Sequence, residues 1–350
     1  MVTTLEFGGR EIGTGQPCFI VAEAGVNHNG DLDMAQQLVE VAGRAGADAV
    51  KFQTFKAERL VTLNARKAEY QQQTTGAEES QYDMLHRLEL STEAHQDLIA
   101  RCREQGILFM STPFDEKSAD VLETLGVPGF KIASGELTNL PFLEHVARKG
   151  RPMIVSTGMA CLGEVEAAVR AISATGNRRY ALLHCVSDYP ASPEDVNLRA
   201  MHTLQAAFGV PVGYSDHTEG AEVALAAVAL GARIIEKHFT LDRSLPGPDH
   251  RASLEPDELR HLVQGIRTVE AALGHGRKEP AQREGATAAA ARKSLVANRD
   301  IPAGAVLTDD LIAVMRPGTG LPPSMRPHVV GRTARVPIPE GSVLMLDMLA

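Results

Sequence analysis

The chain has 350 residues, of which 44% are hydrophobic, and its formal net charge at pH 7 is −9. This length suits one large α/β domain with a small second one, and the negative charge argues against nucleic acid as a partner. No apolar run approaches the roughly 20 residues of a membrane span, and the first residues lack the basic-then-apolar pattern of a signal peptide, so we expect a cytoplasmic protein that does not bind membranes.

Short apolar runs recur eight times, and each ends in polar residues or glycine. Runs without polar alternation are typical of strands buried on both faces. They cover residues 18–25, 49–55, 107–114, 129–136, 152–159, 180–187, 211–218 and 233–240. Amphipathic stretches between them predict helices, for example at 33–45, 91–105, 163–175 and 221–230, with Asp31 and Ser91 as N-caps of the first two.

Eight strand–helix units in about 250 residues predict a TIM (β/α)₈ barrel over residues 1–273, with an open doubly wound sheet as the alternative. The polar segment 56–90 predicts a long active-site loop with some helix. Residues 274–291 are rich in Gly, Ala and charge and are predicted to be a linker. Residues 292–350 have short apolar runs broken by Pro and Gly, which predict a small, mostly β domain that leans on another surface for stability.

Four cysteines stand far apart in the sequence, and none forms a C-x-x-C pair. We therefore expect reduced thiols, as in a cytosolic enzyme, rather than a disulfide framework or a cysteine zinc site. They are Cys18, Cys102, Cys161 and Cys185, the last interpreted as a packing residue.

In a barrel of this kind, the catalytic residues stand at the carboxyl ends of the strands. Lys51 and Lys131, with neighbouring hydroxyls and Gly-flanked amides, predict a phosphate or carboxylate site there, although a lone strand-end lysine is more often a surface cation. His217 and His238 end neighbouring strands and can bind one Mn²⁺, Mg²⁺ or Zn²⁺ ion, against the alternative of buried structural histidines. Asp216 either orients His217 or caps the next helix.

Ten segments, in order along nearly the whole chain, resemble the sialic acid synthase family, and residues 292–350 look like the antifreeze-like (SAF) domain of these enzymes. The segments are AEAGVNHNG (22–30), AVKFQTF (49–55), STPFD (111–115), KIASGELTNLP (131–141), STGMA (156–160), YPASPEDVNLRAM (189–201), GYSDHT (213–218), EKHFTLD (236–242), PGPDH (246–250) and MRPGTG (315–320).

The resemblance implies a role for each matching residue. Phosphoenolpyruvate is expected at Lys51, Thr112, Lys131, Ser134, Ser156 and Ser215. The sugar is expected at Gln53, Glu136, Tyr189 and Asp249, and a divalent metal, Mn²⁺ or Mg²⁺, at His217 and His238. Glu23 and Glu236 match carboxylates near the metal and the reacting carbons. Some bacterial relatives have Asn in contact with the phosphate where this chain has Ser187, which can still donate a hydrogen bond.

The activity implied is the condensation of phosphoenolpyruvate with an N-acylated mannosamine-type hexosamine to a nine-carbon 2-keto sugar acid, with phosphate leaving by C–O cleavage. N-acetylmannosamine would make the chain an N-acetylneuraminate synthase; the alternative is an N,N'-diacetyllegionaminate synthase that uses 2,4-diacetamido-2,4,6-trideoxymannose. The resemblance also implies a domain-swapped homodimer, in which Arg316 of one subunit enters the barrel of its partner. A Schiff-base aldolase using Lys131 or Lys51 and a non-enzymatic binding protein are the competing hypotheses.

Overall fold

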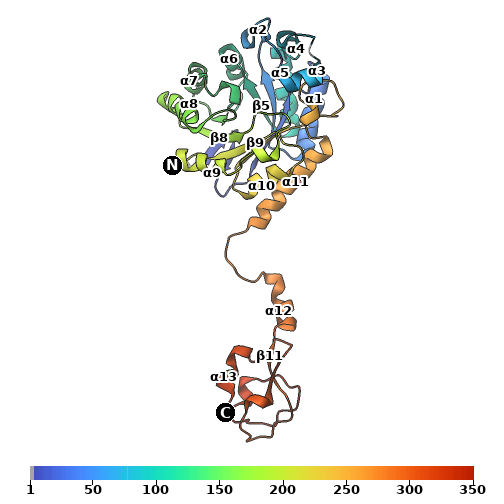
Figure 1. Ribbon diagram of the computed structural model, residues 1–350, viewed down its shortest axis with the longest axis vertical. Helices are drawn as coiled ribbons and strands as arrows, with labels where there is room; N and C mark the ends of the chain where they lie inside the picture. Colours follow the sequence, from blue (N-terminus) through green and yellow to red (C-terminus); the bar gives the residue numbers. More distant parts are fainter. Residues whose placement is uncertain (1–3, 77) are drawn as a thin grey trace. The chain divides into compact units, whose positions relative to one another are not determined.

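The computed structural model describes residues 4–76 and 78–350, which form two compact units that divide between Gly274 and His275 (Figure 1). The first unit is built around eight parallel strands in the order β5-β4-β3-β10-β9-β8-β7-β6, and β5 and β6, at the two ends of this order, also lie against each other. The predicted (β/α)₈ barrel is therefore confirmed, and the open-sheet alternative is wrong.

Each of the eight predicted runs contains one barrel strand. The strands are β3 (Phe19–Gly25), β4 (Ala49–Thr54), β5 (Leu108–Pro113), β6 (Phe130–Ile132), β7 (Met153–Ser156), β8 (Tyr180–Cys185), β9 (Val212–Asp216) and β10 (Ile234–His238). The helices outside them are α1 (Leu32–Ala45), α5 (Thr92–Gln105), α6 (Glu116–Thr124), α7 (Leu140–Arg148), α8 (Leu162–Ala174), α9 (Ala200–Phe208), α10 (Glu222–Ala229) and α11 (Pro256–Leu273). The side chains of Asp31 and Ser91 accept hydrogen bonds from backbone N–H groups in the first turns of α1 and α5, as predicted for N-caps.

A short N-terminal hairpin, β1 (Thr4–Phe7) and β2 (Arg10–Gly13), lies at the amino-terminal end of the barrel. Its side chains Leu5, Phe7 and Ile12 are buried in one cluster with the inward-facing residues from the early part of the strands, such as Phe19 and Ile234. This apolar plug fills one end of the barrel, so the space for a ligand lies at the carboxyl ends of the strands.

The segment predicted as an active-site loop folds into three short helices, α2 (Ala57–Leu60), α3 (Glu69–Thr75) and α4 (Gln81–Arg87). Apolar residues of α2 and α4 pack with residues that follow β3 and β4, including Val26 and Phe55, in a cluster separate from the main core. No helix among the described residues is long and apolar enough to cross a membrane.

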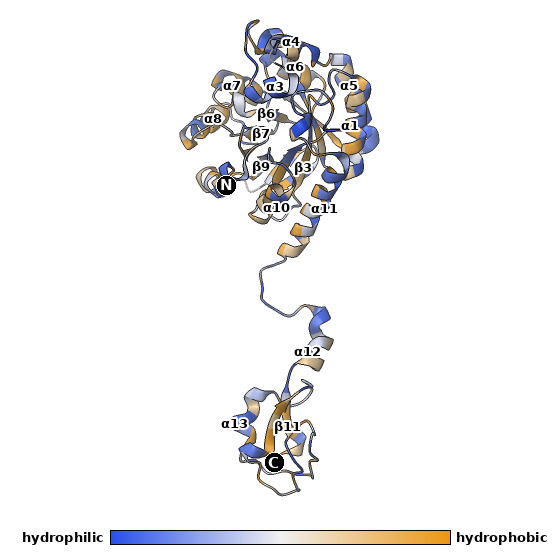
Figure 2. Cartoon of the chain, turned by 45° about the vertical axis from the view of Figure 1, so that its right-hand side comes forward, coloured by the Kyte–Doolittle hydropathy of each residue, from blue (hydrophilic) through white to orange (hydrophobic). Residues whose placement is uncertain are grey.

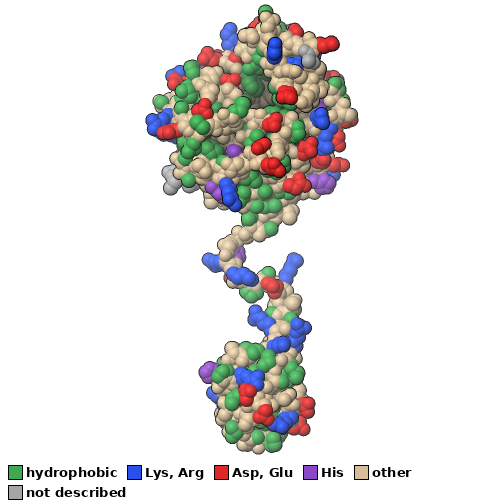
Figure 3. Space-filling model, viewed as in Figure 1, with side chains coloured by type: hydrophobic (Ala, Val, Ile, Leu, Met, Phe, Trp, Pro, Cys, Tyr) green, Lys and Arg blue, Asp and Glu red, His purple; other side chains and the backbone are tan. Residues whose placement is uncertain are grey.

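The second unit holds a two-stranded antiparallel sheet, β11 (Ser294–Ala297) and β12 (Ile312–Met315), with isolated bridges and the short helix α13 (Arg326–Val329) around it. β11 is mostly apolar (Figure 2), and its residues Leu295 and Ala297 belong to a small core within this unit. The stretch predicted as a linker contains α12 (Gly285–Ala291), which has no buried residue. Lysine and arginine side chains stand out along residues 277–293 (Figure 3).

Candidate active site

The polar site and the apolar plug belong to the same inward-facing faces of the strands. Side chains alternate between the two faces of a strand, so every second residue points into the barrel. In β10, Ile234 belongs to the plug, and Glu236 and His238 follow it at steps of two. In β4, Ala49 is likewise followed by Lys51. The change from apolar to polar along each inner face places the functional groups at the carboxyl ends.

A cavity of about 470 Å³ opens at these ends. Fifteen of the sixteen residues predicted for the site line it: Glu23, Lys51, Gln53, Thr112, Lys131, Ser134, Glu136, Ser156, Ser187, Tyr189, Ser215, His217, Glu236, His238 and Asp249. The sixteenth, Arg316, belongs to the second unit, where it is exposed and its Nε donates a hydrogen bond to the carbonyl of Ala291.

Two lysines and two glutamates form a buried charge cluster at the base of the cavity. Lys51 Nζ lies 2.6 Å from Glu23 Oε2 and 3.9 Å from Glu236 Oε2, and it donates a hydrogen bond of 2.9 Å to Thr112 Oγ1. Lys131 Nζ lies 3.3 Å from Glu236 Oε1. Neither lysine is therefore a surface cation, which was the alternative interpretation of a lone strand-end lysine. An anion that enters the cavity meets two ammonium groups from which water is largely excluded.

The two glutamates have opposite electrostatic environments. Burial raises the pKa of Glu23 to about 7, although Lys51 opposes this shift. Burial also disfavours the charged form of Glu236, but Lys131 and Lys51 outweigh it and lower the pKa of this carboxyl. Ser215 Oγ supports the ionised form by donating a hydrogen bond of 3.0 Å to Glu236. The pair therefore combines one carboxyl that exchanges a proton near neutrality with one that stays ionised, a division typical of acid–base sites.

Two histidines present free ring nitrogens beside this cluster. The rings of His217 and His238 are 5.4 Å apart between centroids. His217 Nδ1 lies 2.6 Å from the carbonyl oxygen of Val186, which can only accept, so Nδ1 carries a proton and the neutral ring has its free lone pair on Nε2. His238 Nδ1 is buried and has no hydrogen-bond partner among the described residues, and burial lowers the pKa of this ring well below its ordinary value. Burial disfavours the charged form of His217, but its contacts with Cys185 and the Val186 carbonyl outweigh burial and raise the pKa of this ring. In their neutral forms, the two rings fit a divalent metal ion.

The protein can supply only part of such an ion's coordination sphere. Within the described ranges 4–76 and 78–350, no group of three or more His, Cys, Asp or Glu side chains is arranged to hold a metal. Two imidazole nitrogens leave the remaining positions to substrate oxygen atoms or water. A site with open positions is typical of metals that act on a substrate rather than on folding.

Hydroxyl groups converge on the part of the cavity formed by β6, β7 and β8. Ser134, in the 3-10 turn η1 (Ser134–Glu136), accepts a hydrogen bond of 2.9 Å from the backbone N–H of Gly158. A Cβ at position 158 would collide with the hydroxyl oxygens of Ser134 and Ser187, so glycine is required for their close approach. Buried Ser156 Oγ has no partner among the described residues and remains available to a ligand.

The structure differs from the sequence interpretation at Asp216, which neither orients His217 nor caps the next helix. Its carboxylate pairs with buried Lys237 at 2.7 Å and accepts hydrogen bonds from the backbone N–H and hydroxyl of Thr218. Asp216 and Lys237 thus form an internal ion pair. Cys185, interpreted as a packing residue, lines the cavity, with Sγ 3.8 Å from His217 Nδ1.

One wall of the cavity comes from α2, α3 and α4, and the sequence interpretation assigned none of its residues to the site. Tyr70 of α3 packs against Tyr189, with ring centroids 5.0 Å apart, and Tyr189 in turn packs on His217 at 4.1 Å. Gln71 and Gln81 also line the cavity. A polar, Gln-rich sequence is typical of a solvated loop. Only the unusual length of segment 56–90 indicated that it contributes to the active site.

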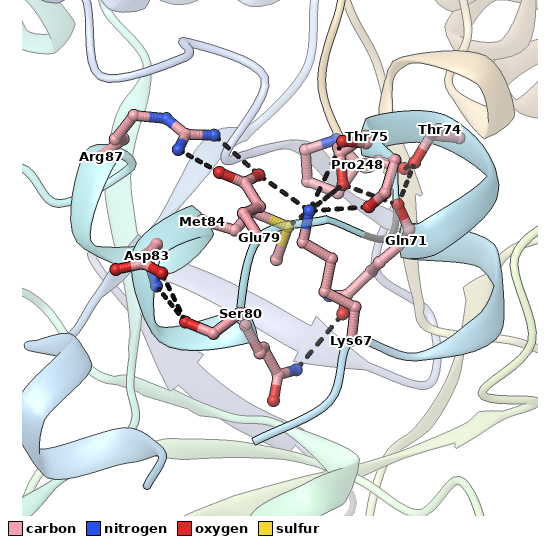
Figure 4. Close-up of polar contacts among 12 residues, drawn as sticks. Lys67, Gln71, Thr74, Thr75, Glu79, Ser80, Asp83, Met84, Arg87 and Pro248 are labelled. Atoms are coloured by element: carbon pink, nitrogen blue, oxygen red, sulfur yellow. Dashed lines mark hydrogen bonds and ion pairs between the residues drawn. The ribbon is translucent and has the colours of Figure 1, made fainter. Parts of the chain in front are cut away.

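A buried lysine fixes this wall (Figure 4). Lys67 Nζ donates hydrogen bonds to Thr75 Oγ1 and Glu79 Oε1, both at 2.8 Å, and to the carbonyl of Gly76 at 3.0 Å. Its side chain is 1% exposed. The ammonium thereby sits at the carboxyl end of α3, where it also complements the helix dipole. Thr74 Oγ1 donates to the carbonyl of Pro248, next to Asp249, at 3.4 Å.

The chain is similar to known proteins over nearly its whole length. Residues 38–278 match the NeuB family and residues 292–350 match the SAF domain. The chain is 50% identical to N,N'-diacetyllegionaminic acid synthase of Legionella pneumophila, over 96% of this chain and 95% of that protein. It is 38% identical to human N-acetylneuraminate-9-phosphate synthase, over 97% of this chain and 95% of that protein. The crystal structure of N-acetylneuraminic acid (sialic acid) synthetase from Leptospira borgpetersenii in complex with citrate matches with a TM-score of 0.72 at 38% identity, covering 82% of this chain and 95% of that one.

Proposed function

The chain belongs to the NeuB family, and we propose that it condenses phosphoenolpyruvate with an N-acylated mannosamine-type sugar to give a nine-carbon 2-keto sugar acid and phosphate. The observation that carries this proposal is the meeting, in one cavity, of two buried lysines, two carboxyls of opposite pKa shift and two histidines with free nitrogens. The lysines suit an anionic substrate, the two carboxyls suit a proton transfer, and the histidines suit a divalent metal.

Phosphoenolpyruvate binds at the base of the cavity, where Lys51 and Lys131 offset its charge. The hydroxyls of Thr112, Ser134, Ser156, Ser187 and Ser215 position its phosphate and carboxylate. The sugar lies against Gln53, Glu136, Tyr189 and Asp249. Held in this way, C3 of phosphoenolpyruvate is directed at the aldehyde carbon of the open-chain sugar, which removes much of the entropic cost of bringing the two together.

His217 and His238 would hold Mn²⁺ or Mg²⁺, which supplies Lewis-acid polarisation of the aldehyde oxygen when bound. The new C–C bond leaves C2 electron-poor, and water adds there. Glu23, whose pKa lies near neutrality, takes the proton of this water as general base. Glu236 stays ionised between the lysines and stabilises the positive charge that develops at C2. Phosphate then leaves with the bridging oxygen, by C–O cleavage, while the new C2 hydroxyl gives up its proton and becomes the keto group. Of the two protons released from the water, one ends on the former aldehyde oxygen and the other on phosphate.

Two sugars are candidates. The 50% identity to N,N'-diacetyllegionaminic acid synthase supports 2,4-diacetamido-2,4,6-trideoxymannose, and the match to N-acetylneuraminic acid synthetase supports N-acetylmannosamine as the second candidate. The homodimer with Arg316 reaching a partner's barrel, and the cytoplasmic location, are further parts of the proposal that follow from the resemblance and from cysteine usage.

The test is incubation of the enzyme with phosphoenolpyruvate, Mn²⁺ or Mg²⁺ and each sugar, with mass spectrometry of the product. We expect a nine-carbon keto acid and one equivalent of phosphate. Borohydride reduction in the presence of pyruvate tests the competing aldolase hypothesis, because a Schiff base on Lys51 or Lys131 would be trapped covalently. A trapped adduct without phosphate release would refute the proposed function.

A further inference from the structure

The cavity wall formed by α2, α3 and α4 differs in chemistry from the base of the cavity. It presents the amides of Gln71 and Gln81 and the hydroxyl of Tyr70 beside apolar side chains. The apolar part consists of Leu60, Val61, Met84, Leu85 and Leu88. Among the described residues that line the cavity, the lysines are Lys51 and Lys131 at the strand ends, and there is no arginine. The wall is therefore neutral, with both amide and apolar surface.

The orientation of the two amides follows from one backbone group. Gln71 Oε1 accepts a hydrogen bond of 3.0 Å from the N–H of Ala68, so its oxygen side is fixed. Gln81 must then turn its NH₂ group toward Gln71, and Nε2 donates to the same oxygen at 3.2 Å. This arrangement leaves the carbonyl oxygen of Gln81 to accept a hydrogen bond from a ligand N–H.

A donor stands at the other end of the same hydrogen-bonded chain, which runs through the Gln71 amide. Gln71 Nε2 donates to Tyr70 Oη at 3.3 Å, so the Tyr70 hydroxyl keeps its own proton for another partner. Burial raises the pKa of Tyr70, which holds the hydroxyl in its protonated form. The wall thus offers one acceptor, one donor and an adjoining apolar surface supported by the packed cluster around Met84 and Leu88. An acylamido group has the complementary set: an N–H, a carbonyl and a methyl.

A phosphorylated sugar does not suit this wall. None of the five lysines and arginines of residues 56–90 lines the cavity, and two of them, Lys67 and Arg87, both bind Glu79. Arg87 of α4 lies on the same side of Glu79 as Asp83 and away from Gln71 (Figure 4). A phosphate against the wall would lose its hydration without gaining a counter-charge, which is unfavourable.

We propose that the wall formed by α2, α3 and α4 is a subsite for a second acylamido group of the sugar, with Gln81 and Tyr70 as specificity-determining residues that favour a neutral diacetamido sugar over a monoacetamido or phosphorylated one. The subsite rests on the proposed function and deepens it. The acylamido N–H donates to Gln81, the Tyr70 hydroxyl donates to the acyl carbonyl, and the methyl packs on the apolar surface.

The experiment compares three sugars with phosphoenolpyruvate: 2,4-diacetamido-2,4,6-trideoxymannose, N-acetylmannosamine and N-acetylmannosamine 6-phosphate. The wild-type enzyme should prefer them in that order by kcat/KM. In Gln81→Leu, the ratio of kcat/KM for the diacetamido sugar to that for N-acetylmannosamine should fall about five- to tenfold, the equivalent of one neutral hydrogen bond. The KM for phosphoenolpyruvate should stay unchanged.

Gln73→Leu is the control, because Gln73 is an exposed glutamine of α3, in the same wall, that does not line the cavity; its ratio should equal that of wild type. If Gln81→Leu fails to fold, Tyr70→Phe makes the same test by removing a single oxygen atom. Equal loss with both acetamido sugars, or an unchanged ratio, overturns the subsite. A wild-type preference for N-acetylmannosamine or its phosphate also overturns the subsite, but it does not contradict the proposed function. No phosphate release with any of the three sugars overturns both.

Discussion

Replacing Lys67 by methionine should loosen the cavity wall without disturbing the barrel. The substitution keeps the length and the apolar stem but removes the ammonium that binds Thr75, Gly76 and Glu79. A hydrogen bond to a charged group contributes about 1.5–3 kcal/mol. Glu79 keeps Arg87 as a partner and its side chain is 25% exposed, so solvent screens its part of the loss. We expect a net cost of about 2–3 kcal/mol.

All these contacts lie within a short segment, so the cost should appear as local opening. Hydrogen–deuterium exchange of the α3 amides should become about 30- to 150-fold faster, with little change in the barrel helices. The KM for the sugar should rise severalfold, because Tyr70 and Gln71 lose their fixed positions, whereas the KM for phosphoenolpyruvate should not.

Lys149→Met provides the control for this measurement. Lys149 is also a largely buried lysine that binds two carboxylates, those of Asp120 and Glu123, but it follows α7 and does not line the cavity. Its loss should affect stability and leave the sugar KM alone. Two results would show that Lys67 does not position the wall. One is unchanged hydrogen exchange of α3 in Lys67→Met, and the other is an equal rise of the sugar KM in Lys149→Met.

The remaining predictions concern the base of the cavity and the second unit. Removal of metal with EDTA should abolish phosphate release, and Mn²⁺ or Mg²⁺ should restore it; full activity of metal-free enzyme would remove the metal role from His217 and His238. Lys131→Ala should lower kcat/KM for phosphoenolpyruvate about ten- to a hundredfold with the fold intact by circular dichroism, and normal kinetics would take Lys131 out of the site. A base must be deprotonated to act, and the pKa of Glu23 is raised to about 7, so kcat/KM should rise with pH through neutrality and level off above it; a Glu23→Gln variant that keeps this acidic limb would assign it to another group. Co-expressed His217→Ala and Arg316→Ala chains should recover about a quarter of wild-type activity, because about half of the dimers are mixed and one of their two sites is complete; a mixture that stays inactive would place Arg316 in its own barrel or outside the site.

The base of the cavity could be predicted because strand periodicity is a local property. An inner face that changes from apolar to polar, as from Ile234 to Glu236 and His238, can be read along a few residues, and a barrel brings all such ends together. The resemblance then supplied roles for the residues. The side-chain caps at Asp31 and Ser91 were predictable for the same reason, since a cap involves only the first turn of a helix.

The wall could not be predicted, because its structure depends on contacts between distant parts of the chain. Helices of seven residues such as α3 and α4 are not stable alone, and here they are held by Lys67 and by packing of Tyr70 on Tyr189. Neither contact leaves a periodic signal. The Asp216–Lys237 pair could not be predicted for a similar reason, because it joins two neighbouring strands. In addition, an aspartate next to a histidine has an obvious local interpretation.

The charged base and the neutral wall of the cavity differ in how readily substitutions can change the specificity of the enzyme. Lys51, Lys131, Glu23 and Glu236 hold one another in the base, and removing one member of such a buried cluster leaves uncompensated charge at a cost of about 3–5 kcal/mol. The contacts of Tyr70, Gln71 and Gln81 in the wall are neutral hydrogen bonds of about 1 kcal/mol each. Substitutions at these three residues should therefore change which sugar is accepted at a small cost in stability, whereas the base has little freedom to vary. A set of wall variants should accordingly differ widely in sugar preference while sharing nearly one KM for phosphoenolpyruvate.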